Sequence, residues 1–191
     1  METKGITVYC ASSTAVADSY FEAARELGTL IARSGLPLIT GAGNIGLMGA
    51  VNDAALAAGG VTVGVIPQFM VERGWHHTGL SRLIVTDGMH SRKETMASLA
   101  RGVIALPGGI GTFEELMEII TWRQLGLYDG NIVIYNVDGY YDNLLAMLGT
   151  AVERGFMKAD HRRLWSVAAD AAEAVAMATT EPSPLTLTPK F

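Results

Sequence analysis

The amino-acid sequence predicts an α/β protein, a three-layer sandwich in which a central parallel β-sheet is flanked by helices. Short apolar segments alternate with segments of helical period along the chain. One short segment, GVIAL at residues 102–106, is apolar throughout, as in a strand buried on both faces. With 191 residues, 49% of them hydrophobic, the chain is long enough for one domain with a substantial core.

Seven short segments are expected to form the strands. They are residues 5–10, 36–40, 61–66, 82–86, 102–106, 131–136 and 164–167. Pro37 has no backbone N–H to donate to a sheet, so it belongs near the beginning of its strand. Because helical segments connect the strands, the crossovers are expected to be right-handed and the sheet parallel.

Six segments are expected to be helical. They are residues 15–33, 47–58, 90–100, 112–125, 142–154 and 169–178. Phe21, Leu27 and Ile31 have helical spacing in the first, and Gly59 and Gly60 end the second. Residues 67–79 are expected to be irregular, and residues 181–191, rich in Pro and Thr, are expected to be a mobile tail.

Charge and cysteine content argue against several classes of protein. The formal net charge is −5 without a broad basic face, so no nucleic-acid partner is expected. No apolar run reaches the ~18 residues that cross a bilayer, and the N-terminus lacks a signal-peptide pattern, so no membrane partner is expected. Cys10 is the single cysteine, which excludes an intramolecular disulfide and suits a cytoplasmic location. Cys10 itself is expected to be a buried strand residue.

Two glycine-rich loops are expected at the carboxyl ends of strands, where α/β sheets bind ligands. The first, GAGNIG at residues 41–46, has the spacing G-x-G-x-x-G. It follows the second expected strand rather than the first, and no acidic residue ends the next strand. Both features argue against a dinucleotide site.

The second loop, PGGIGT at residues 107–112, precedes a helix that carries several glutamates. Glycines let backbone amides approach an anion such as a phosphate. No lysine follows the loop, which argues against a nucleotide triphosphatase. Thr112 is expected to be the N-cap of the helix, with Glu115 completing a capping box. A functional role for Glu115 stays open, because Glu114 and Glu118 add more acid than a cap requires.

These residues carry a resemblance to a known family. PGGIGTFEE at residues 107–115 matches the signature P-G-G-x-G-T-x-x-E, and MHSRK at residues 89–93 matches M-H-x-R-K. Three further blocks are similar: GAGNIGLMG, TWRQLG and NVDGYYDNLL. The chain resembles the Lonely Guy (LOG) family of cytokinin riboside 5′-monophosphate phosphoribohydrolases, whose members are often labelled as possible lysine decarboxylases.

The resemblance implies one Rossmann-like nucleotide-binding domain over residues 1–180, in a homodimer or a larger assembly. It implies hydrolysis of the N-glycosidic bond of a purine nucleoside 5′-monophosphate, either AMP or a nucleotide of N6-modified adenine. The products would be the free base and ribose 5-phosphate. Neither a cofactor nor a metal is expected.

The resemblance also implies the site residues. Arg92 and Glu115 correspond to the catalytic pair of the family, and a carboxylate would stabilise the oxocarbenium character of the breaking bond. The substrate is expected to contact Met89, Lys93, Gly43, Asn44, Gly108, Gly109, Ile110, Gly111, Thr112, Glu114 and Thr121. Ala42 and Gly74 depart from the family pattern, which often has a glycine and an acid at these places.

Two alternatives remain open at this point. A non-catalytic carrier of a nucleotide or of molybdenum cofactor would need the glycine loop but not both Arg92 and Glu115. A pyridoxal-phosphate lysine decarboxylase would need a Schiff-base lysine in a pocket, and only Lys93 lies near the expected loops. The three tryptophans, Trp75, Trp122 and Trp165, are expected to be packing residues.

Overall fold

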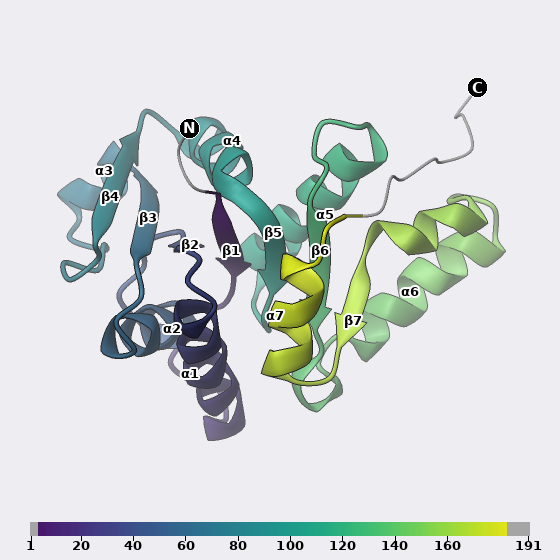
Figure 1. The fold of residues 1–191 in the computed structure, drawn as a ribbon. Helices are drawn as coiled ribbons and strands as arrows, with labels where there is room; N and C mark the ends of the chain where they lie inside the picture. The colour runs from purple at the N-terminus through teal and green to yellow at the C-terminus, as the bar shows by residue number, and fades with distance from the viewer. Residues whose placement is uncertain (1–3, 183–191) are drawn as a thin grey trace.

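Seven parallel strands form the central sheet of the computed structural model, which describes residues 4–182 (Figure 1). Their order in space is β4-β3-β2-β1-β5-β6-β7. The strands are β1 (Gly5–Tyr9), β2 (Leu38–Thr40), β3 (Thr62–Pro67), β4 (Arg82–Thr86), β5 (Ala100–Ala105), β6 (Asn131–Tyr135) and β7 (Ser166–Ala168). The predicted α/β class is confirmed.

Strand β1 marks the point at which the strand order reverses. From β1 the chain adds β2, β3 and β4 on one side, returns through a helix, and adds β5, β6 and β7 on the other side. The register places Ile6 of β1 between Leu38 of β2 and Gly102 of β5. The loops that leave β1 and β5 therefore diverge toward opposite faces, and a crevice is expected between them.

Helices cover both faces of the sheet and make the three layers (Figure 1). Ile6 and Val8 pack with α1, α2 and α7, whereas Tyr9 and Val65 pack with α4 and α5 on the opposite face. The helices are α1 (Asp18–Arg33), α2 (Gly46–Ala57), α3 (Gln68–Glu72), α4 (Met89–Leu99), α5 (Ile110–Gln124), α6 (Asp142–Glu153) and α7 (Ala171–Thr179), with 3₁₀ turns η1 (Val137–Gly139) and η2 (Ala159–Leu164).

The prediction that residues 67–79 are irregular is wrong for their first part, which forms α3. Pro67 precedes this helix in an extended conformation, with φ −71° and ψ 149°, as suits an N-cap position. Gln68 Nε2 also donates to Glu72 Oε1 at 3.1 Å, one helical turn away. One turn of helix is too short to leave a periodic pattern in the sequence.

The predicted capping box at Thr112 is also wrong. Helix α5 begins at Ile110 with Gly109 as its N-cap, so Thr112 already lies within the first turn. The buried side chain of Thr112 packs against Gly108, where a Cβ atom would overlap it. The carboxylate of Glu115 is therefore not needed as a cap.

The remaining elements begin and end within three residues of the predicted positions. Helix α1 begins at Asp18 rather than at residue 15, and the 3₁₀ turns η1 and η2 were not predicted. Most of the predicted mobile tail, residues 183–191, lies outside the described residues.

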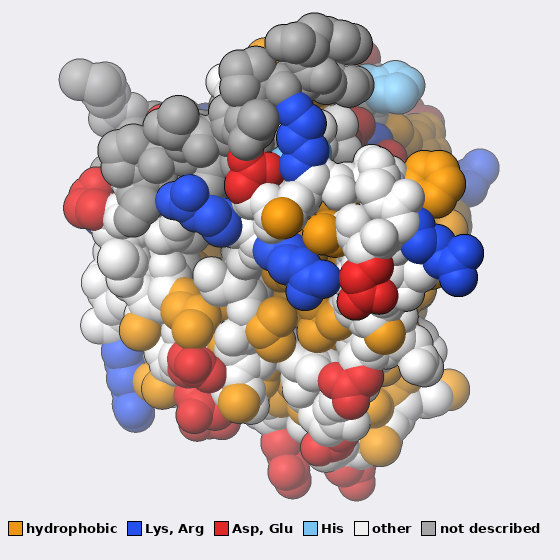
Figure 2. Space-filling model, turned by 90° about the vertical axis from the view of Figure 1, so that its right-hand side faces the viewer, with side chains coloured by type: hydrophobic (Ala, Val, Ile, Leu, Met, Phe, Trp, Pro, Cys, Tyr) orange, Lys and Arg blue, Asp and Glu red, His pale blue; other side chains and the backbone are white. Residues whose placement is uncertain are grey.

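The surface seen from the right of Figure 1 carries basic and acidic side chains interspersed with apolar ones (Figure 2). That described face offers a nucleic-acid backbone no continuous basic track. Within residues 4–182, none of the helices has both the length and the hydropathy that a bilayer crossing requires.

Gly46 holds the start of α2 directly against the loop that follows β1. Its φ is +64°, and a Cβ atom there would overlap the backbone of Ser12. The N–H of Met48 donates to the Ala11 carbonyl at 3.2 Å across the same contact. The glycine thus brings two of the loops at the crevice together.

Replacing Gly46 by alanine is expected to lower the free energy of unfolding more than replacing Gly59. Gly59 has a similar φ of +77°, but a Cβ atom there would meet nothing within 4 Å. Gly59→Ala carries backbone strain alone, about 1 kcal/mol. Gly46→Ala adds a clash, a further ~1–3 kcal/mol. Urea denaturation of both variants measures the difference, and equal losses would contradict the close approach.

Candidate active site

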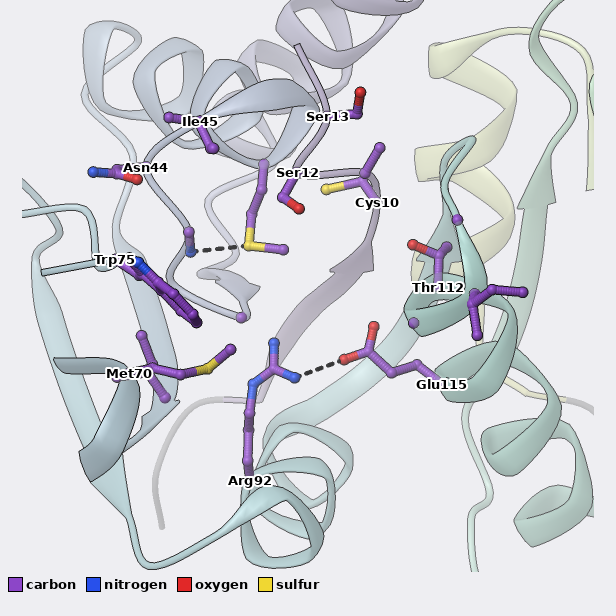
Figure 3. A pocket seen from close by; sticks show the side chains of 18 of the residues that line it. Cys10, Ser12, Ser13, Asn44, Ile45, Met70, Trp75, Arg92, Thr112 and Glu115 are labelled. Atoms are coloured by element: carbon purple, nitrogen blue, oxygen red, sulfur yellow. Dashed lines mark hydrogen bonds and ion pairs between the residues drawn. The ribbon is translucent and has the colours of Figure 1, made fainter. Parts of the chain in front are cut away.

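A cavity of about 660 Å³ opens at the carboxyl ends of β1, β2, β3 and β5 (Figure 3). Its walls come from the loop after β1, the GAGNIG loop after β2, the segment after β3, and the first turns of α4 and α5. This is the place where the strand order reverses. The topology alone therefore brings segments from five parts of the sequence around one space.

Arg92 of α4 and Glu115 of α5 face each other at the base of this cavity (Figure 3). Arg92 Nη1 donates to Glu115 Oε1 at 3.0 Å, and Arg92 Nε donates to the Val65 carbonyl at 3.1 Å. The two side chains are only 8% and 10% exposed. A Cβ atom at Gly41 would overlap the guanidinium, so the glycine is what lets Arg92 lie against the β2 loop.

Burial dominates the electrostatics of Glu115. Desolvation raises the pKa of its carboxyl above the ordinary value, although the adjacent charge of Arg92 opposes this. Glu114 raises the pKa further, and Lys93 lowers it. The site therefore holds a carboxyl that takes up a proton at higher pH than a surface glutamate, as suits acid–base or charge-stabilising chemistry.

The first turn of α5 lines the opposite side of the cavity with Gly109, Ile110, Gly111 and Thr112. Their backbone N–H groups precede any helical carbonyl that could accept from them. The N-terminus of a helix favours an anion, and the amides of this turn can bind phosphate oxygens. The first turn of α5 can therefore bind an anion, and the next turn of the same helix carries the carboxylate of Glu115.

Nine of the thirteen predicted site residues line the cavity. They are Gly43, Asn44, Met89, Arg92, Gly109, Ile110, Gly111, Thr112 and Glu115. The other four, Lys93, Gly108, Glu114 and Thr121, do not line it. Gly108 lies behind the cavity wall, where its carbonyl accepts from Tyr140. Thr121 lies about two turns beyond Glu115 along α5, and its hydroxyl donates to the Met117 carbonyl at 2.8 Å.

Lys93 points away from Arg92, because consecutive helical residues lie on different faces. Its ammonium pairs with Glu114 and with Glu118, the latter at 3.0 Å. Burial lowers the pKa of Lys93, but the hydrogen bonds to the two carboxylates outweigh it and leave the pKa above its ordinary value. Lys93 thus ties α4 to α5. Lys93 does not line the cavity described above, where a Schiff-base lysine would be needed.

Several lining residues were not predicted. They are Cys10, Ala11, Ser12, Ser13, Ile45, Met48, Ile66, Met70 and Trp75, together with Gly41. The packing role predicted for Trp75 is wrong, since the residue is 48% exposed at the cavity and the Arg73 guanidinium lies 4.9 Å from its ring. Cys10 is buried, as predicted, but it lies one residue beyond the end of β1 rather than in the strand. Burial raises the pKa of its thiol.

Two histidines fix the wall that carries Trp75. His76 pairs with Gly43 in an isolated β-bridge, and the His77 N–H donates to the Ala42 carbonyl at 2.8 Å. His77 Nε2 also lies 2.8 Å from Asp53 Oδ1. Within residues 4–182 no three His, Cys, Asp or Glu side chains gather as metal ligands would. These histidines position the loop after β3 instead.

Sequence comparisons relate this chain to known proteins. A family model described as "Possible lysine decarboxylase" matches residues 48–178. The chain is 43% identical over 170 residues to cytokinin riboside 5′-monophosphate phosphoribohydrolase LOG of Oryza sativa subsp. japonica, covering 89% of this chain and 70% of that protein. It is 41% identical over 172 residues to LOG1 of Arabidopsis thaliana, covering 90% of this chain and 81% of that protein. The chain belongs to the LOG family.

Solved structures share the scaffold of this LOG-family chain. The molybdenum cofactor binding protein of Rippkaea orientalis has a TM-score of 0.71 at 22% identity, covering 92% of this chain and 95% of that one. A Moco carrier protein of Chlamydomonas reinhardtii has a TM-score of 0.69 at 24% identity, covering 92% and 94%. At these identities the likeness concerns the fold alone.

Replacing Lys93 by methionine is expected to lower the free energy of unfolding by about 1–2 kcal/mol, because Glu114 and Glu118 then repel each other without a cation between them. Arg162→Met is the matched control. Arg162 forms a 4.0 Å pair with Glu153 in which both side chains are exposed, so its loss should stay below about 0.5 kcal/mol. Urea denaturation compares the two, and equal values would contradict a structural role for Lys93.

Proposed function

We propose that this chain hydrolyses the N-glycosidic bond of purine nucleoside 5′-monophosphates and releases the free base and ribose 5-phosphate. The observation that carries the proposal is the buried Arg92–Glu115 pair at the base of a cavity that the α5 N-terminus also lines. The two relatives, about 40% identical to this chain, are phosphoribohydrolases, which supports the same reaction class.

The phosphate is proposed to bind at the first turn of α5. Its oxygens would accept from the amides of Gly109, Gly111 and Thr112, where the helix dipole favours negative charge. Glu115 is three residues further along the helix, a rise of about 4.5 Å. That spacing is comparable to the separation of a 5′-phosphate from the ribose ring, so the carboxylate would lie beside the ribose.

Glu115 is proposed to act on the ribose as the glycosidic bond breaks. The bond breaks with oxocarbenium character, which a nearby carboxylate stabilises, and the same carboxylate can orient the attacking water. Arg92 holds the carboxylate in place through its Nη1 donor. Its fixed, planar guanidinium also faces the cavity, where it can stabilise negative charge on the departing base.

The base is proposed to lie against the apolar wall of the cavity. Ile66, Met70, Trp75 and Met89 contribute flat or flexible apolar surface there. Such a wall accepts a purine and tolerates an alkyl group on N6, so AMP and cytokinin nucleotides are both proposed as substrates. A homodimer in the cytoplasm is proposed with them.

A carrier of molybdenum cofactor is the second candidate, because the solved structures with this fold include such carriers. The buried carboxylate weighs against it. A carboxylate one turn from the anion-binding amides lowers affinity for an anionic cargo, and burying it costs free energy that carriage alone would not require. Catalysis of glycosidic cleavage, in contrast, requires a carboxylate beside the ribose.

Glu115→Gln is expected to lower the rate of adenine release from AMP by at least about 100-fold, because it removes the negative charge beside the ribose. Glu118→Gln is the matched control: Glu118 lies one turn along the same helix, pairs with Lys93, and does not line the cavity. Chromatographic assay of free base compares the variants. Equal rates in Glu115→Gln and the parent protein would rule out the proposed role.

The acidic limb of kcat/KM against pH is expected above the ordinary pKa of a glutamate. Burial raises the pKa of Glu115, and the active carboxylate form is lost as the pH falls through that raised value. Gly41→Ala should move the limb to still higher pH, because the added Cβ displaces the Arg92 guanidinium that now lowers this pKa. A limb at the same pH in both proteins would contradict the coupling.

A further inference from the structure

Two tyrosines lie behind the glycine loop of residues 107–112. Tyr140 Oη donates to the Gly108 carbonyl at 2.5 Å, and Tyr141 Oη donates to the Leu106 carbonyl at 2.7 Å. Both come from the connection between β6 and α6, and neither lines the cavity. Their hydroxyls contact the loop on the side away from the site.

A trans peptide places its C=O and the following N–H on opposite sides. Because the Gly108 carbonyl is directed at Tyr140, the N–H of Gly109 is directed away from Tyr140. Gly109 lines the cavity, and the backbone hydrogen bonds among residues 4–182 leave this N–H without an acceptor. The hydroxyl of Tyr140 thus fixes the direction of one of the amides proposed to bind phosphate.

The Tyr140 hydroxyl is the hydrogen-bond partner of this peptide among residues 4–182. The peptide joins two glycines, which accept φ of either sign, so rotation of the peptide unit costs little. A Cβ atom at Gly109 would meet nothing within 4 Å, so the Gly109 side leaves room for this rotation, whereas the Gly108 side packs against Thr112. The preceding peptide is fixed separately, because the Pro107 carbonyl accepts from the Ala11 N–H at 3.1 Å.

Tyr140 is 39% exposed, but its ring contacts three other aromatic rings. Its ring packs edge-on against Tyr141, with centroids 5.1 Å apart, and stacks on Phe113 at 6.3 Å. Tyr20 of α1 contacts it edge-on at 6.0 Å. Next to it, Asp138 accepts from Ser19 Oγ at 2.7 Å. A hydroxyl donor whose ring is packed in this way favours one orientation of the peptide between Gly108 and Gly109.

We propose that Tyr140 is a positioning residue for the 5′-phosphate of the substrate, acting through the peptide between Gly108 and Gly109. This inference rests on the proposed function only in that the cavity binds a nucleoside 5′-monophosphate by its phosphate. Tyr140 touches no reacting atom. Loss of its hydroxyl releases the peptide and costs the phosphate a hydrogen-bond donor.

The test compares AMP with adenosine, which lacks the phosphate. Tyr140→Phe and the control Tyr20→Phe are made in the Glu115→Gln background, where AMP is not expected to be consumed. Tyr20 contacts the same ring, but its hydroxyl makes no hydrogen bond to residues 4–182. Titration calorimetry should give AMP binding weaker by about threefold to tenfold in Tyr140→Phe, with adenosine binding unchanged. Tyr20→Phe should bind both ligands as the background protein does.

An equal loss for AMP and adenosine in Tyr140→Phe would overturn the inference, since it would show a general structural effect. Unchanged AMP binding would also overturn it. The proposed hydrolysis has a separate test: it is contradicted if the parent protein binds AMP but releases no adenine. In that case the difference between AMP and adenosine binding still decides the role of Tyr140.

Discussion

The buried ion pair between Arg92 and Glu115 joins the two halves of the sheet at the point where the strand order reverses. Removing both charges from water costs several kcal/mol per ion unless other groups compensate. The fold compensates with the Val65 carbonyl on the guanidinium and with a glycine at position 41 that leaves it room. Lys93, beside Arg92, ties the same two helices together through a second, more exposed set of carboxylates. The neighbouring backbone and side chains therefore hold Arg92 in place against the carboxylate of Glu115.

The first two turns of helix α5 favour opposite charges in a ligand. Its first turn presents free amides to the cavity, and its second turn presents Glu115. A ligand that is anionic at one end and develops positive charge a few ångströms away suits both turns, as a nucleoside 5′-monophosphate does during glycosidic cleavage. The crowded acids of this helix then divide into two functions. Glu115 faces the cavity, whereas Glu114 and Glu118 hold Lys93.

Features encoded locally were predictable from the residues themselves, whereas the pairing of Arg92 with Glu115 was implied only by the family resemblance. Strand and helix alternation predicted the α/β class, and the glycine loops predicted where the cavity would lie. The cap predicted at Thr112 failed because the S/T-x-x-E pattern is local, whereas the partner of Glu115 lies 23 residues away on another helix. Trp75 was missed because burial of an aromatic residue is decided by packing, and here the residue stays 48% exposed beside the cavity.

The most direct measurement is the product stoichiometry when the parent protein is incubated with AMP. If Glu115 promotes cleavage of the glycosidic bond of AMP, adenine and ribose 5-phosphate accumulate in equal amounts and at the same rate. Release of adenosine with inorganic phosphate would show that the phosphate ester, not the glycosidic bond, lies at the reactive carboxylate. AMP recovered intact from the protein would show a binding protein without this chemistry. Either of the last two results would contradict the proposed role of the Arg92–Glu115 pair.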